Sequence, residues 1–201
     1  FLDFIQNYEK EKDLDVWILL SSCLYSLDKL TNKNNKEIFV GKILKIINPL
    51  IEKFGYLPGK DDSPRLLELR GILIKIKANI CNDKKTIDYC RELHEEHLET
   101  DKYIEPNLLS SIISVVASNG EGKDYEVFVD KFKNAKNPQE ERRYQSSLCL
   151  FNHESSFLNT LKMSLDGTIR TQDAPYLIAL CLRNKTFGDK TWTFIKDNWE
   201  D

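Results

Sequence analysis

The sequence has no long hydrophobic run, no paired cysteine motif and no excess of charge of one sign. None of its apolar segments approaches the roughly 20 residues that span a bilayer, and its first residues lack the basic stretch and apolar core of a signal peptide. The 29 Lys and Arg residues and 32 Asp and Glu residues give a net charge of -3, and the two signs alternate along the chain. We therefore expect neither a membrane partner nor a nucleic-acid partner.

Motifs of common enzyme classes are missing as well. The chain contains no G-x-S-x-G, P-loop or G-x-G-x-x-G sequence. Its cysteines stand singly inside apolar periodic segments, without a C-x-x-C pair: Cys23, Cys81, Cys90, Cys149 and Cys181. This pattern favours buried, reduced thiols over disulfides and predicts a reducing, cytoplasmic location. We predict no catalytic residue in this chain.

One segment, His94-Glu95-Glu96-His97, suggests a metal ligand set. Zincin peptidases use H-E-x-x-H, in which two histidines four residues apart bind one zinc ion from the same helical face. Here the histidines are three residues apart, and no third ligand is evident nearby. We interpret the segment as a solvated helix face rich in glutamate and predict no metal site. For His153 we predict a capping or surface role.

Helical periodicity dominates the first half of the chain. Apolar residues recur at steps of three and four over residues 14–30, and again over 43–54. We expect the second of these helices to be kinked or split at Pro49, because proline lacks the N–H that the helix needs. Gly55 should end it, because glycine tolerates positive φ.

The next predicted helix starts at Ser63-Pro64, a favourable cap followed by a first-turn proline. It is the most regular in the chain and runs to about Ile80. Gly71 lies in its middle and costs about 1 kcal/mol relative to alanine. A glycine at such a position usually permits close approach of another backbone, and we expect that here. A further helix is predicted from about Thr86 to Glu99.

Beyond residue 105 one apolar pattern occurs three times, at intervals of 33 and 34 residues: Tyr125, Phe128 and Phe132; Leu158, Leu161 and Leu165; Trp192, Ile195 and Trp199. Such a period is typical of stacked helical hairpins. We expect each of the three faces to pack against its neighbours. The predicted fold is all-α, a right-handed superhelical stack of helical hairpins like HEAT or armadillo α-solenoids, forming one domain over residues 1–201.

Two basic features remain. Arg142 and Arg143 follow an acidic first turn, and we interpret them as members of surface ion pairs. Arg170 lies in the interhelical loop 166–173. Loops at one edge of a helical stack commonly contact ligands, and arginine can bind a carboxylate bidentately. A surface ion pair is the alternative for Arg170.

Several segments, in order, resemble the C-terminal helical domain of zinc aminopeptidases of the aminopeptidase N and puromycin-sensitive type. They are Asp15-Val16-Trp17, Pro49-Leu50, Gly55-Tyr56-Leu57-Pro58-Gly59, Leu66-Leu67-Glu68-Leu69-Arg70-Gly71, Pro138-Gln139-Glu140-Glu141, Ile169-Arg170-Thr171-Gln172-Asp173 and Trp192-Thr193-Phe194-Ile195-Lys196-Asp197-Asn198-Trp199. The closing tryptophan segment is the strongest part of this resemblance.

The resemblance implies a fragment of a large exopeptidase that removes N-terminal residues from peptides. The zinc ion and its ligands would then belong to a catalytic domain outside this chain, and this chain would hold no cofactor. It would close the substrate cavity, contact the distal end of the peptide, with Arg170 as a candidate binding residue, and show no hydrolysis by itself. Its partners would be the catalytic domain and the peptide substrate. The abrupt apolar start, Phe1-Leu2-Asp3-Phe4-Ile5, is also typical of a piece of a longer protein.

The alternative from a different class is a free-standing α-solenoid adaptor that binds partner proteins on its concave face. An H-E-x-x-H motif upstream of Phe1 would distinguish the aminopeptidase from the adaptor.

Overall fold

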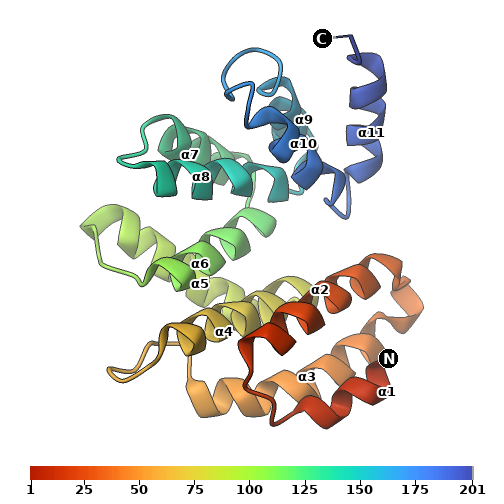
Figure 1. Ribbon diagram of the computed structural model, residues 1–201, viewed down its shortest axis with the longest axis vertical. Helices are drawn as coiled ribbons and strands as arrows, with labels where there is room; N and C mark the ends of the chain where they lie inside the picture. Colours follow the sequence, from red (N-terminus) through yellow and green to blue (C-terminus); the bar gives the residue numbers. More distant parts are fainter. Residues whose placement is uncertain (201) are drawn as a thin grey trace. The chain divides into compact units, whose positions relative to one another are not determined.

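The computed structural model describes residues 1–200, which form helices and turns without a β-strand (Figure 1). This confirms the predicted all-α class. The contacts within the chain divide it into two compact units, unit 1 (Phe1–Val115) and unit 2 (Val116–Asp201). The single solenoid domain and its handedness stay predictions.

Unit 1 contains the longest helices of the described chain, with 17 residues in α2, 19 in α3 and 17 in α5. In order, its elements are α1 (Leu2–Ile5), η1 (Gln6–Tyr8), α2 (Leu14–Leu30), η2 (Lys33–Asn35), α3 (Lys36–Phe54), α4 (Pro64–Lys75), the π-helical turn η3 (Ile76–Ile80) and α5 (Lys84–Thr100). Helix α6 (Pro106–Ser118) begins in unit 1 and ends in unit 2.

Local capping groups start α2 and α4, and the cap at Ser63 is the one that the sequence predicts. The Asp13 carboxylate accepts hydrogen bonds from the N–H groups of Asp15 and Val16, and Ser63 Oγ accepts one from Leu66 N. Gly55 ends α3 with a φ of 66°. Helix α3 nevertheless runs unbroken through Pro49, so it is not split there. Buried isoleucine and leucine side chains on both sides of Pro49 hold the helix together despite the lost backbone hydrogen bond.

The interior of unit 1 is mainly aliphatic. Its buried side chains include Trp17, Leu24, Ile43, Ile47, Leu69, Leu73 and Ile76. Gly71 of α4 faces Ser111 of α6 so closely that a Cβ on Gly71 would lie 2.4 Å from Ser111 Oγ. The predicted close approach at Gly71 is therefore confirmed, and its partner is α6.

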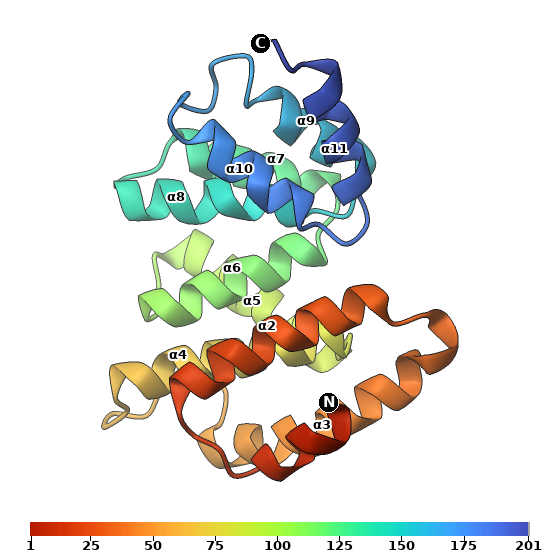
Figure 2. The same cartoon turned by 45° about the vertical axis from the view of Figure 1, so that its right-hand side comes forward.

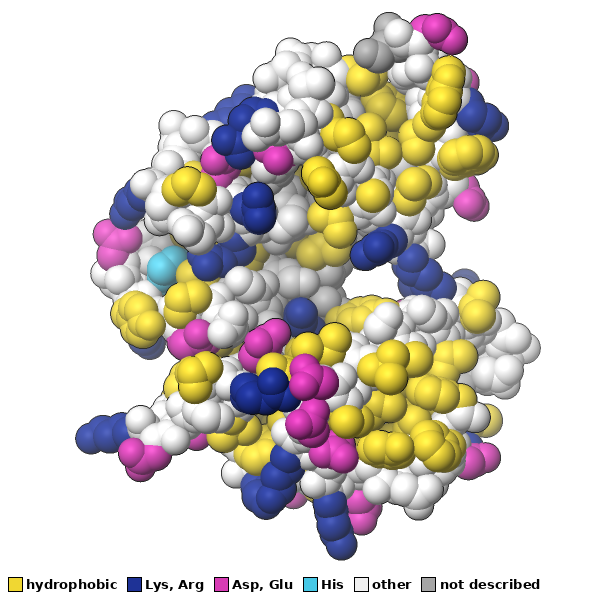
Figure 3. Space-filling model, viewed as in Figure 1, with side chains coloured by type: hydrophobic (Ala, Val, Ile, Leu, Met, Phe, Trp, Pro, Cys, Tyr) yellow, Lys and Arg dark blue, Asp and Glu magenta, His cyan; other side chains and the backbone are white. Residues whose placement is uncertain are grey.

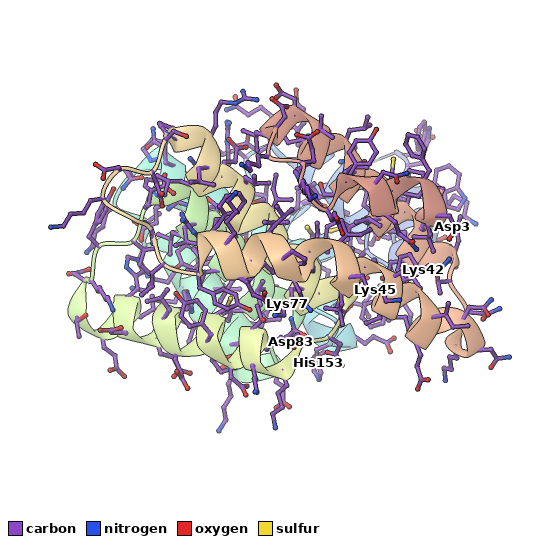
Figure 4. The ribbon with its side chains drawn as sticks, turned by 90° about the horizontal axis from the view of Figure 1, so that it is seen from below. Asp3, Lys42, Lys45, Lys77, Asp83 and His153 are labelled. Atoms are coloured by element: carbon purple, nitrogen blue, oxygen red, sulfur yellow. The ribbon has the colours of Figure 1, made fainter. Side chains whose placement is uncertain are left out.

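Charged contacts help to join the elements of unit 1. Arg70, only 2% exposed, donates from Nε to the Gly55 carbonyl at 3.1 Å and from Nη2 to the Phe54 carbonyl at 3.0 Å. The same Nη2 forms an ion pair with Asp62 at 2.6 Å, so Arg70 fixes the end of α3 to the following loop. At the surface, Lys42 of α3 pairs with Asp3 of α1 (Figure 4).

Unit 2 is built from shorter helices. They are α7 (Gly122–Lys133), α8 (Pro138–Ser147), the 3₁₀ turn η4 (Leu148–Leu150), α9 (Glu154–Lys162), α10 (Ala174–Leu182) and α11 (Gly188–Asp197). Helix α8 lies beside α7 and also contacts α10, and α10 in turn packs on α11 (Figure 2).

Aromatic rings fill the centre of unit 2. Phe128 packs edge-on against Tyr144 and against Phe151, with ring centroids 5.2 Å apart in both pairs, and Tyr125 meets Phe151 in the same way at 5.3 Å. Edge-to-face geometry is favoured by the charge distribution of aromatic rings. The predicted inward face of Tyr125, Phe128 and Phe132 is confirmed.

The repeat also appears in unit 2 as hydrogen bonds between residues 34 or 35 positions apart. Asn152 Nδ2 donates to the Ser118 carbonyl at 2.9 Å, and Asn184 Nδ2 donates to the Cys149 carbonyl at 2.9 Å. Asn159 Nδ2 donates to the Tyr125 hydroxyl at 3.1 Å. Equivalent places in successive hairpins are therefore linked by side-chain amides.

The inward faces predicted for α9 and α11 are confirmed only in part, because Leu161 is buried and Leu158 and Ile195 are half-buried. In α9 Phe157 and Leu161 are buried, whereas Leu165 lies beyond the end of the helix and is 43% exposed. In α11 Thr191 is fully buried, while Trp192 and Trp199 are 56% and 75% exposed. The helix places Thr191 inward because a threonine side chain fits the space at this position, whereas the larger indole of Trp192 would not.

Candidate functional site

The candidate site is a groove in unit 2 between α8 and α10, called here the α8–α10 groove. Its volume is about 500 Å³, which is within the range of ligand sites. Its lining residues are Arg142, Gln145, Ser146, Asp173, Tyr176, Leu177 and Leu180. Helix α8 supplies the first three and α10, with its N-cap Asp173, supplies the others.

The α10 side of the groove is apolar. Leu177 is buried, Leu180 is half-buried, and Tyr176 is 75% exposed at the rim. Figure 3 shows hydrophobic side chains at the surface over α10 and α11, and the exposed large ones on these helices are Tyr176, Leu182 and Trp192. This wall suits an apolar ligand side chain.

The α8 side of the groove is polar. Gln145 is buried and Ser146 half-buried, and Arg142 is exposed one turn earlier on the helix. Among residues 1–200 no carboxylate lies within ion-pair distance of the Arg142 guanidinium. The interpretation of Arg142 as a member of a surface ion pair is therefore wrong, and its charge is available to an anion in the groove.

Arg170, the residue that the sequence favours for substrate binding, stands at the edge of this groove. Its Nε donates to Asp173 Oδ2 at 2.7 Å, and its Nη2 lies 3.2 Å from Glu141 Oε1. The hydrogen bond to Asp173 and the charges of both carboxylates raise the pKa of Arg170, so it stays protonated. Arg170 thus bridges α8 and the start of α10, and its contact with substrate stays a prediction.

The two histidines of the His94–His97 segment point in different directions. His94 is buried on the inner face of α5, whereas His97 Nδ1 donates a hydrogen bond to the Lys102 carbonyl at 2.7 Å. Glu92, Glu95, Glu96 and Glu99 are exposed, so the solvated face is confirmed for the glutamates but is wrong for His94.

Residues 1–200 contain no cluster of three or more His, Cys, Asp or Glu side chains that could hold a metal ion. The side chains present do not fit a zinc site, and no step of a zinc reaction can be assigned to them. His153 is exposed, as the predicted surface role requires, and it occupies the N-cap position of α9 without a side-chain capping hydrogen bond. Its Nδ1 lies 3.0 Å from Ser155 Oγ.

Signals for the groove are weak in the sequence. Arg170 could be selected because it lies in an interhelical loop. The joint contribution of Arg142, Tyr176 and Leu180 could not be predicted, because these residues come from two helices separated by a 26-residue interval that contains α9. The acidic first turn before Arg142 and Arg143 indicated the start of a helix but not the side that α8 presents to α10. Within residues 1–200 every helix is too short or too polar to cross a lipid bilayer.

Comparison with known proteins adds a family to this geometry. The family model described as the ERAP1-like C-terminal domain matches residues 1–201. The endoplasmic reticulum aminopeptidase 1 of Rattus norvegicus is 25% identical over 160 residues, which are 78% of this chain and 17% of the relative. The same enzyme of Mus musculus is 25% identical over 159 residues, again 78% and 17%.

Endoplasmic reticulum aminopeptidase 2 of Bos taurus is 22% identical over 160 residues, covering 78% of this chain and 16% of the relative. The chain therefore spans about one sixth of the length of the curated relatives that it matches. Because the family model matches the whole chain, the chain belongs to the family of ERAP1-like C-terminal domains found in aminopeptidases.

Proposed function

We propose that this chain is the non-catalytic C-terminal domain of a zinc-dependent aminopeptidase and that its α8–α10 groove binds the carboxyl end of the peptide substrate. One observation carries the proposal: the same groove contains Arg142, which has no ion-pair partner among residues 1–200, and an apolar wall. A peptide end offers the matching chemistry, a carboxylate next to a side chain.

Each wall of the groove has a part in this proposal. Arg142 binds the terminal carboxylate through two parallel N–H···O hydrogen bonds, which are stronger than neutral ones. Leu177 and Leu180 contact the last side chain of the peptide, and Tyr176 covers it from the rim. Binding of this kind holds the distal end of a long peptide while its amino end is cleaved in the catalytic domain.

Arg170 has a second place in the proposal. Its guanidinium already contacts Asp173 and Glu141, so an incoming carboxylate must replace one of them. Arg170 would then bind longer peptides that extend past Arg142. In the intact enzyme, Arg170→Ala should weaken hydrolysis of long peptides more than that of single-residue amides, and equal effects on both would remove this role.

A binding experiment on the chain itself tests the groove. We expect a heptapeptide ending in leucine with a free carboxylate to bind at least ~10-fold more tightly than the same peptide with a terminal amide, because a charged hydrogen-bonded pair contributes roughly 1.5–3 kcal/mol. Arg142→Ala should remove this preference, whereas Arg65→Ala, which changes an exposed arginine of unit 1, should leave it intact. The measurement is calorimetric titration at low salt.

Equal affinity for the acid and the amide in the unmodified chain would contradict the proposed groove. Binding of internal peptide segments regardless of their ends would instead favour the free-standing adaptor. A separate assay with aminoacyl chromogenic substrates tests the proposed lack of catalysis, and zinc-dependent turnover by this chain would refute it.

Cytoplasmic location is also part of this proposal, and its support is that all five cysteines are unpaired. The names of the relatives place those proteins in the endoplasmic reticulum. Fractionation of cells that express the natural protein would test the location directly.

A further inference from the structure

Gln145 is a polar side chain buried in the wall of the α8–α10 groove. It lies on α8 one turn after Arg142, so both side chains extend from the same side of the helix and both line the groove. Only 9% of Gln145 is exposed. Ser146 lines the groove as well, but its hydroxyl already donates to the Arg143 carbonyl at 3.2 Å.

The carboxamide of Gln145 has no hydrogen-bond partner among residues 1–200. A carboxamide carries one acceptor oxygen and two N–H donors, and buried polar groups of native proteins are nearly always paired. The buried hydroxyls of Ser147, Ser164 and Thr191, by contrast, each donate to a backbone carbonyl of unit 2. The carboxamide therefore points to a partner outside this chain, in the groove that Gln145 lines.

We infer that Gln145 binds the last peptide bond of a ligand whose terminal carboxylate lies on Arg142. This inference rests on the proposed function of the groove and defines its ligand class more narrowly, as chains with an amide next to the carboxylate. A peptide group offers one N–H and one C=O, and a carboxamide pairs with both through two hydrogen bonds. Fatty-acid anions have no such group.

The arrangement of side chains in the groove matches the arrangement of groups at a peptide end. In a peptide, one Cα atom separates the last N–H from the carboxylate carbon, and the last side chain branches from the same Cα. In the groove, Arg142 and Gln145 stand on neighbouring turns of α8, and Leu177 and Leu180 supply the apolar wall from α10. The carboxylate, the amide and the side chain of one residue thus each have a partner.

Gln145 would determine specificity by this contact. A ligand without the amide leaves the buried carboxamide unpaired, and that cost opposes binding. Sites that hydrogen-bond a ligand group reject analogues lacking the group more strongly than an apolar pocket rejects a ligand of slightly different size. Leu177 and Leu180 alone would accept any apolar carboxylate of the right length, whereas the groove with Gln145 selects peptides.

Calorimetric titration of the whole chain compares two ligands that differ in one group. The first is the heptapeptide ending in leucine with a free carboxylate. In the second, leucic acid replaces the leucine, so that an ester oxygen stands in place of the last N–H. We expect the ester to bind ~10-fold more weakly, because it loses a hydrogen bond and leaves the buried acceptor of Gln145 unpaired. Decanoate, a carboxylate without an amide, should bind more weakly than the peptide too.

Two methionine variants provide the controls. Gln145→Met keeps the length of the side chain and removes the carboxamide, so it should bind peptide and ester equally. Its preference for the free-acid peptide over the terminal amide should remain, because Arg142 is unchanged. Gln139→Met, at an exposed glutamine of the same helix, should keep the difference between peptide and ester. If Gln145→Met does not fold, Gln145→Ala takes its place.

Equal binding of peptide and ester by the unmodified chain overturns the inference, and so does a difference between them that persists in the Gln145 variant. Decanoate binding as tight as that of the peptide also overturns it, because the groove would then accept apolar carboxylates in general. If the free acid is still preferred to the amide in these cases, the proposed function of the groove stands without Gln145. Loss of that preference in the unmodified chain contradicts the proposed function itself.

Discussion

Unit 1 packs long helices around aliphatic side chains, whereas unit 2 packs short helices around aromatic rings and side-chain hydrogen bonds. Helix α3 has 19 residues and places six hydrophobic side chains in the interior of unit 1. Helix α9 has nine residues, and its buried face includes Ser156 and Thr160. The two units thus bury their helical faces with different kinds of side chain.

The difference has a physical reason. Aliphatic contacts have no preferred direction, so unit 1 needs a few specific features, Gly71 and Arg70, to set how its helices and loops meet. Edge-to-face rings and amide hydrogen bonds are directional, so unit 2 can repeat one arrangement at intervals of 34 or 35 residues.

The largest effect is expected at Arg70. Arg70→Ala should lower the free energy of unfolding by about 3 kcal/mol, because it leaves the carbonyls of Phe54 and Gly55 without the buried donor that they share and breaks the ion pair with Asp62. Urea unfolding followed by the fluorescence of the buried Trp17 would measure this in unit 1.

Arg65→Ala is the matched control, because Arg65 pairs with Asp15 and Asp13 at the exposed surface. It should leave the urea midpoint close to that of the unmodified chain. If the two variants behave alike, Arg70 does not hold the loop of unit 1.

A smaller effect with opposite signs is expected at two glycines. Gly71→Ala should destabilise unit 1 by about 2 kcal/mol, since the new Cβ would lie 2.4 Å from Ser111 Oγ and 3.1 Å from Ser111 Cβ. Gly41→Ala in α3 should stabilise it by up to about 1 kcal/mol, because nothing lies within 4 Å and alanine favours the helix.

The same urea titration measures both glycine variants. Adding Ser111→Ala to Gly71→Ala should restore part of the lost stability, because it removes the closest atom. A stabilising Gly71→Ala would show that α4 and α6 do not approach as closely as the structure has them.

The smallest effect is expected in the polar network of unit 2. Tyr125→Phe removes a hydroxyl that lies 3.0 Å from Thr160 Oγ1 and 3.1 Å from Asn159 Nδ2. We expect a loss of about 1 kcal/mol, seen as faster hydrogen exchange in α7 and α9 with α3 unchanged. Tyr176→Phe, at an exposed tyrosine, is the control and should change nothing. Unchanged exchange in Tyr125→Phe would mean that ring packing alone holds unit 2.

The sequence predicted the helices well because their signals are local. Asp13 and Ser63 cap the residues that follow them, and Gly71 marks a close contact whatever its partner is. The 33- to 34-residue repeat could also be recognised in the sequence, and in the structure hydrogen bonds join equivalent positions of the repeat. None of these features depends on knowing which helix lies opposite.

The inward faces of α9 and α11 could not be read in the same way. Leu158, Leu161 and Leu165 have helical spacing, but the helix ends at Lys162, before the last of them. Trp192 and Trp199 are the largest apolar side chains of their segment, yet Thr191 is the one that fits inside. Hydrophobic periodicity predicts which side of a helix is buried, but it does not decide between neighbouring residues on that side. The shape of the opposing surface decides which of them is buried.

By itself, the sequence determined that this protein is helical, where most of its helices begin and that its second half repeats. Only the tertiary structure decided that His94 is buried and that, among residues 1–200, Arg170 is paired while Arg142 is not. The reason is distance along the chain: caps and turns depend on residues within four positions, whereas pairing and burial depend on side chains that only folding brings together.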